Sequence, residues 1–171
     1  MKITGYMLRE SIKQHELRRD TAARAFPGTL NKFPNEEKET PHQAVKTFLE
    51  AEDAIVRLQV AQSLYNLAVK VEANGEKMTL EEAIKRIGGY ARAEKMWRSA
   101  AGPKNDRYSS YGNNDRERDH TKVFAKETVT STEAVKFATA AAKKAGALRA
   151  AIATGNASSV EMEDLDPTLF E

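Results

Sequence analysis

HQAVKTFLEAEDAIVRLQVAQSLYNLAVKVEA, residues 42–73, is the longest uninterrupted helical pattern in the chain. It follows Pro41 and stops at Asn74-Gly75, a pair that favours a turn. At 1.5 Å per residue it would form a rod roughly 48 Å long. Its apolar residues recur three and four apart in two stripes: Ala44, Phe48, Ala51, Ile55 and Leu58, then Val60, Leu64, Leu67 and Val71. Two stripes on one rod predict that this helix packs against more than one partner helix.

Three further helices are expected around this rod, over residues 4–25, 79–101 and 130–154. Thr4 suits an N-cap, and Phe26-Pro27-Gly28 would end the first helix. The other two each open with a capping box, TLEE at 79–82 and TSTE at 130–133. The last helix carries a seam made mainly of alanine, which predicts a closely approaching neighbour: Ala134, Ala138, Ala141, Ala145, Leu148 and Ile152.

Together these segments predict one all-α domain over residues 1–171. Its architecture would be an antiparallel four-helix bundle or a long helical hairpin. A large irregular polar insert is expected over residues 102–122, where the helical pattern disappears. One or two short extended segments are expected as well, one over residues 123–129 and one in the acidic C-terminal tail.

Two polar residues, His15 and Arg19, interrupt the apolar side of the first helix. In one interpretation the helix rotates slightly and both side chains reach solvent, since each has a long or amphipathic body. In the other they form a polar layer inside the helical assembly. A buried arginine would then need a carboxylate partner or an anionic ligand.

The amino-acid composition argues against several classes of function and site. The net charge of +2 is too small to argue for nucleic acid, so nucleic-acid binding is not expected. The absence of cysteine excludes disulfides, thiolate zinc sites and cysteine nucleophiles, and it is compatible with the cytoplasm. No apolar run approaches the length that spans a bilayer, so no membrane partner is expected.

No catalytic constellation is found in the sequence. The three histidines, His15, His42 and His120, have no metal-ligand spacing. There is no glycine-rich phosphate loop, nucleophile elbow or zinc-protease helix. We therefore expect no catalytic residues, metal or cofactor, and a binding protein rather than an enzyme.

The polar insert supplies the candidate binding residues. Its basic side chains could donate to phosphate or carboxylate groups, and its tyrosines could stack on a ring: Lys104, Arg107, Tyr108, Tyr111, Arg116, Arg118 and Lys122. Acidic residues alternate with them almost one for one, which is also typical of a solvated loop with weak local ion pairs.

Four pieces of the chain, in this order, resemble the septicolysin-like family of small helical bacterial and phage proteins: MLRESIKQHELRRD (7–20), NGEKMTLEEAIKR (74–86), NDRYS (105–109) and ALRAAIATGNASSVEM (147–162). The chain departs from the family pattern at Ala157, where an aromatic residue is usual, and its insert from Ser110 to Lys122 is longer. The resemblance implies a helical, oligomeric protein and no particular activity.

Two hypotheses follow. The first is a non-enzymatic homo-oligomer that sequesters a small anionic ligand, such as a nucleotide, between polar inserts of neighbouring subunits. The second is a structural or protein-interaction module, with the insert at its rim and no small-molecule ligand. Retention of a small molecule or of a polypeptide distinguishes them.

Overall fold

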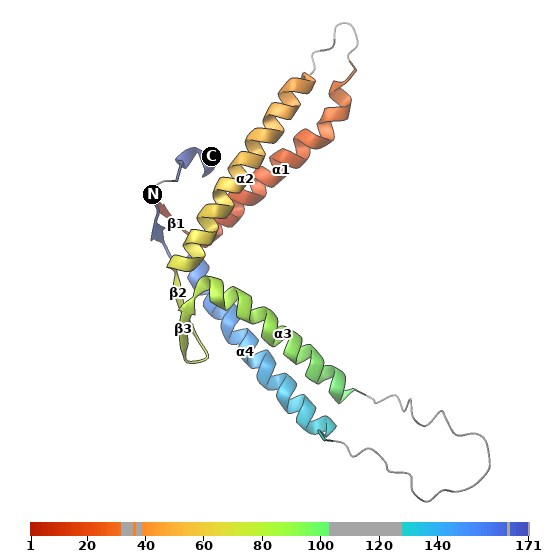
Figure 1. Ribbon diagram of the computed structural model, residues 1–171, viewed down its shortest axis with the longest axis vertical. Coiled ribbons are helices and arrows are strands. Elements are labelled where there is room, and N and C mark those ends of the chain that lie inside the picture. Colours follow the sequence, from red (N-terminus) through yellow and green to blue (C-terminus); the bar gives the residue numbers. More distant parts are fainter. Residues whose placement is uncertain (32–35, 37–38, 103–127, 164, 171) are drawn as a thin grey trace, which may run out of the picture. The chain divides into compact units, whose positions relative to one another are not determined.

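The computed structural model describes residues 1–31, 36, 39–102, 128–163 and 165–170. Within them the chain is mostly helical, which confirms the helical class, and Figure 1 shows the order of its elements. They are β1 (Lys2–Ile3), α1 (Gly5–Thr29), α2 (Pro41–Ala68), β2 (Lys70–Ala73), β3 (Glu76–Thr79), α3 (Leu80–Ala101), α4 (Ser131–Ala157), β4 (Val160–Glu161) and the 3-10 helix η1 (Pro167–Phe170).

The helices α1 and α2 form an antiparallel hairpin and lie side by side along their length (Figure 1). Helix α1 contributes small and aliphatic residues to the core between them: Gly5, Leu8, Ser11, Ile12 and Ala22. Helix α2 contributes a face on which alanine recurs: Ala44, Ala51, Ala54, Ile55, Leu58, Ala61 and Tyr65. Alanine on the buried face leaves little side chain between the two backbones, so the helices can approach closely.

The predicted helix over residues 42–73 is too long at its C-terminal end. Helix α2 ends at Ala68, and residues 70–73 form strand β2, which pairs with β3 in antiparallel register from Lys70↔Thr79 to Ala73↔Glu76. Asn74 (φ 56°) and Gly75 (φ 81°) make the turn, because both need the left-handed region that Asn and Gly tolerate best. Polar and apolar residue types alternate in residues 70–73 (KVEA), which was the local sequence signal for a strand.

Helix α1 extends beyond its predicted end at residue 25, through Pro27 to Thr29. Pro27 has no backbone N–H to donate to the carbonyl oxygen of Ala23, so the helix loses one hydrogen bond in its last turn. The hydroxyl of Thr29 donates to the carbonyl oxygen of Phe26 at 2.7 Å and supports that turn. Thr4 caps the other end, because its side chain accepts from the Met7 amide.

Helices α3 and α4 lie side by side (Figure 1), and both predicted caps are confirmed. Thr79 Oγ1 accepts from the Glu82 amide at 3.0 Å, and Thr130 Oγ1 accepts from the Glu133 amide at 3.2 Å. The alanine seam of α4 is buried from Ala134 to Leu148. Near the loop end of this hairpin, the rings of Trp97 and Phe137 lie 4.7 Å apart. Helix α4 continues to Ala157, three residues beyond the prediction.

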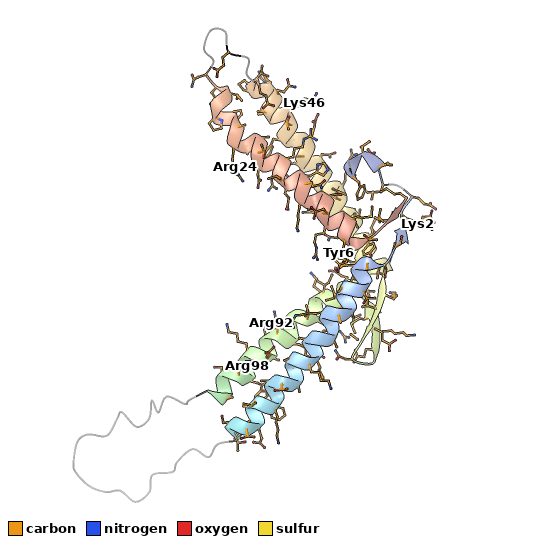
Figure 2. The ribbon with its side chains drawn as sticks, turned by 180° about the vertical axis from the view of Figure 1, so that it is seen from behind. Lys2, Tyr6, Arg24, Lys46, Arg92 and Arg98 are labelled. Carbon is orange, nitrogen blue, oxygen red and sulfur yellow. The ribbon has the colours of Figure 1, made fainter. Side chains whose placement is uncertain are left out.

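Contacts divide the chain into two compact units, and the single domain over residues 1–171 stays a prediction. The first unit comprises Met1–Ile84 and Ala150–Glu171, and the second comprises Lys85–Arg149. The second contains most of the α3–α4 hairpin; its surface includes Arg92 and Arg98 (Figure 2), and Arg98 pairs with Glu94 at 2.8 Å. The first contains the α1–α2 hairpin, both two-stranded sheets and η1.

Candidate functional site

All seven binding residues predicted in the polar insert lie outside the residues that the structure describes. They are Lys104, Arg107, Tyr108, Tyr111, Arg116, Arg118 and Lys122. The extended segment predicted over residues 123–129 also falls outside, apart from its last two residues. The extended segment predicted in the tail is present as β4.

His15 and Arg19 are described, and both are half-buried. Arg19 donates to Asp20 at 2.9 Å and to Glu52 of α2 at 3.3 Å, while its side chain stays 29% exposed. The hydrogen bond to Asp20 and the charges of both carboxylates raise the pKa of Arg19 above its usual value, against the opposing effect of burial. His15 Nε2 lies 3.1 Å from the carbonyl oxygen of Leu169. The two side chains therefore have separate partners at the edge of the hairpin.

Tyr65 attaches the end of α4 to α2. Its side chain is fully buried, and its hydroxyl oxygen lies 2.6 Å from the carbonyl oxygens of both Gly155 and Ser158. One hydroxyl proton is shared between these two acceptors. Burial raises the pKa of Tyr65, and the Gly5 amide partly opposes that change. Gly5 is needed here, because a Cβ at this position would lie 2.9 Å from the Tyr65 ring and would also meet Asn156.

The C-terminal segment is held at both ends. At its start, β4 pairs with β1 in the register Lys2↔Glu161 and Ile3↔Val160. At its end, Leu169 of η1 is buried against the α1–α2 hairpin. Asp166 caps η1 by accepting from the amide and hydroxyl of Thr168 at 3.0 and 2.8 Å. These hydrogen bonds lower the pKa of Asp166, and the charge of Arg57 adds to the effect.

An apolar groove of about 650 Å³ lies between α2 and this C-terminal segment. Its floor is Val56, Val60, Ala61, Leu64, Tyr65 and Ala68 of α2, and its wall includes Val160, Met162, Leu165 and Leu169. Arg57, Glu161, Glu163 and Asp166 add charge to the lining. An apolar floor with charged edges is suited to apolar side chains of a partner.

The apolar surface of α2 extends beyond the groove. Six large aliphatic side chains, which we call the outer face of α2, are 44–59% exposed: Val45, Leu49, Val56, Val60, Leu64 and Leu67. The sequence did show a second apolar stripe at Val60, Leu64 and Leu67, and each of these side chains is 55% exposed. The C-terminal wall was missed, although four apolar residues occur within ten positions there: Val160, Met162, Leu165 and Leu169.

Neither a metal site nor a membrane-spanning helix is found among the described residues. They contain no group of three or more His, Asp and Glu residues that could hold a metal ion. None of their helices combines the length and the apolar content that crossing a membrane requires. Comparison with protein families, with curated proteins and with solved structures finds no match.

Proposed function

We propose that this chain is a non-enzymatic protein-interaction module that works as a homo-oligomer and binds through the outer face of α2 and the adjoining groove. The single observation that supports this function is the row of six large aliphatic side chains on the outer face, each about half exposed. Contiguous apolar surface of this kind is typical of protein-interaction sites, whereas scattered exposed aliphatic residues are ordinary.

Two further observations favour a protein partner over a small molecule at this surface. The groove is open along a helix and continues into an exposed stripe, a shape that suits an amphipathic helix. The septicolysin-like resemblance also implies an oligomer. A bacterial or phage origin, a cytoplasmic location and assembly of the four helices into one bundle belong to this proposal, and the cysteine-free composition supports the location.

Native mass spectrometry of the protein purified from its own host tests this function. We expect a retained polypeptide, whether a second copy or another protein. Leu64→Glu should release it, because the substitution places a charge on the apolar surface. Leu17→Glu on α1 is the matched control, since Leu17 is 65% exposed and lies outside the groove and the outer face. A wild-type chain that retains no polypeptide would remove the proposal.

The composition of the polar insert supports a second candidate, sequestration of a small anionic ligand such as a nucleotide. Lys104, Arg107, Arg116, Arg118 and Lys122 could neutralise the anion, and Tyr108 and Tyr111 could stack on its ring. Isothermal titration against a panel of nucleotides tests it, with Arg107→Ala and Arg116→Ala expected to abolish the heat. No heat from the wild-type chain would exclude it, without affecting the interaction module.

A further inference from the structure

Helix α2 is apolar on two opposite sides. The buried face packs on α1, and the outer face points away from it. The residues of the outer face are three, four or seven positions apart, steps that return to the same side of a helix. A surface helix normally has one apolar stripe, and a helix with two is covered on both sides. Among the described residues the outer face stays about half exposed, so it is available to a partner.

We infer that the outer face of α2 pairs with the outer face of a second copy, antiparallel, about a two-fold axis that crosses α2 at the level of Ile55. The inference rests on the proposed function and names the partner. A two-fold interface requires that a surface be complementary to its own reversed copy. The outer face meets this requirement in both its apolar and its charged residues.

The apolar residues match when the helix is reversed. An axis at the level of Ile55 sets Val45 against Leu64 and Leu49 against Val60, and it brings the two copies of Val56 together. Each of these pairs lies within one helical turn, 5.4 Å along the helix axis. Every aliphatic residue of the outer face from Val45 to Leu64 then has an aliphatic counterpart.

The charged residues Asp53 and Arg57, which flank the outer face of α2, are also complementary to their own reversed copy about the same axis. Asp53 and Arg57 form an ion pair at 2.9 Å within one helix, and both side chains are more than half exposed. In the antiparallel pair, Asp53 lies level with Arg57 of the second copy, so four charges of alternating sign form a network. A parallel pair in register would instead set Asp53 level with Asp53 of the second copy, so its pairing with Arg57 of that copy would not form.

The hollows of the α1–α2 hairpin fit the same arrangement. A smaller apolar hollow of about 220 Å³ lies near the loop end of the hairpin, lined by Ala22, Ala23, Phe26, Ala44, Val45 and Phe48. The axis brings Leu64 of the second copy to Val45 at its edge. It also brings Leu49 of the second copy to Val60 in the larger groove. Each end of the outer face therefore borders an apolar recess.

Light scattering of the recombinant full chain tests the interface. At roughly 50 μM chain we expect twice the monomer mass of 19.0 kDa. Val60→Glu should raise the dissociation constant at least about tenfold, because two carboxylates then enter one apolar interface. Leu17→Glu should leave the mass doubled, since Leu17 lies on α1 and is 65% exposed. A monomeric wild-type chain, or equal effects of the two variants, overturns the inference.

Disulfide capture tests the orientation in this cysteine-free chain. A mixture of Leu49→Cys and Val60→Cys chains should form a cross-linked heterodimer on oxidation. Leu49→Cys alone should not, because its two copies would lie about 18 Å apart along the helices. Cross-linking of Leu49→Cys alone overturns the antiparallel arrangement.

Charge reversal tests the pairing of Asp53 with Arg57 of the second copy. Asp53→Arg should weaken the dimer, and Asp53→Arg combined with Arg57→Asp should restore it. Failure to restore the dimer overturns the predicted charge pairing.

The outcomes separate this inference from the function on which it rests. A wild-type chain that is monomeric but is purified from its host with a different polypeptide on the outer face overturns the self-pairing and the homo-oligomer, and leaves protein interaction through the outer face intact. A chain that retains neither a second copy nor another polypeptide overturns both.

Discussion

The two faces of α2 are both apolar, but they differ in side-chain size and in what covers them. The face toward α1 is rich in alanine and is almost fully buried. The outer face consists of valine and leucine and is about half exposed. Small residues let two backbones of one chain approach closely, whereas large exposed residues offer area to a separate partner. The difference shows that hydrophobicity alone does not tell which face forms the core.

Truncating one leucine on each face should give the largest contrast. Leu58 is fully buried, so Leu58→Ala should lower the free energy of unfolding by about 2–5 kcal/mol. Leu64 is 55% exposed, so Leu64→Ala should change it by less than about 0.5 kcal/mol when the chain is dilute. Urea unfolding measures both. Equal losses in dilute solution would contradict the assignment of the two faces.

The second-largest effect on stability should come from the tight packing around Tyr65 on the buried face. A Cβ added in Gly5→Ala would meet the Tyr65 ring and Asn156, so we expect a loss of about 1–3 kcal/mol. Gly28→Ala is the matched control in the same helix, with no atom within 4 Å of the added Cβ. It should leave stability unchanged or raise it by up to about 1 kcal/mol, because alanine favours helix. Thermal unfolding of the two variants tests the contrast.

Removing the Tyr65 hydroxyl should lower stability somewhat less than Gly5→Ala does. Tyr65→Phe leaves the carbonyl oxygens of Gly155 and Ser158 without this donor, which should lower stability by about 1–2 kcal/mol. Tyr6→Phe is the control, since the Tyr6 hydroxyl (Figure 2) makes only an exposed 3.4 Å hydrogen bond to Ala153.

Stability of the wild type should also fall at alkaline pH. The folded state raises the pKa of Tyr65, so its contribution is complete below the usual value of 10.0 and is lost above it.

Lowering the pH should have the smallest effect on stability, through Asp166 at the C-terminal wall of the groove. The pKa of Asp166 is lowered in the folded state, so its contribution is present above the usual value of 3.8 and is lost as the pH falls below it. The Thr168 amide resonance should therefore titrate with a midpoint below 3.8. Asp166→Asn should abolish this titration while keeping an acceptor for the cap. A midpoint above 3.8 would contradict the cap.

Local signals in the sequence predicted much of the secondary structure. Thr79 and Thr130 cap their helices as expected, and Asn74-Gly75 makes a turn, because these depend on neighbouring backbone groups alone. The strand after α2 was missed, because Val71 continues the helical stripe of Val60, Leu64 and Leu67 as well as it fits a strand. Pairing with β3 decides between the two structures, and pairing is a tertiary contact. His15 and Arg19 were correctly noted as interruptions, but their partners, Leu169 and Glu52, are distant in sequence.

The sequence by itself determined the helical class, the approximate helix positions and the presence of two apolar stripes on the central helix. Only the tertiary structure decided which stripe is buried and which is exposed, and that the C-terminal segment returns to form a groove beside the exposed one. The physical reason is that periodicity places side chains on a face of one helix. What covers that face depends on contacts between residues as far apart as Tyr65 and Ser158.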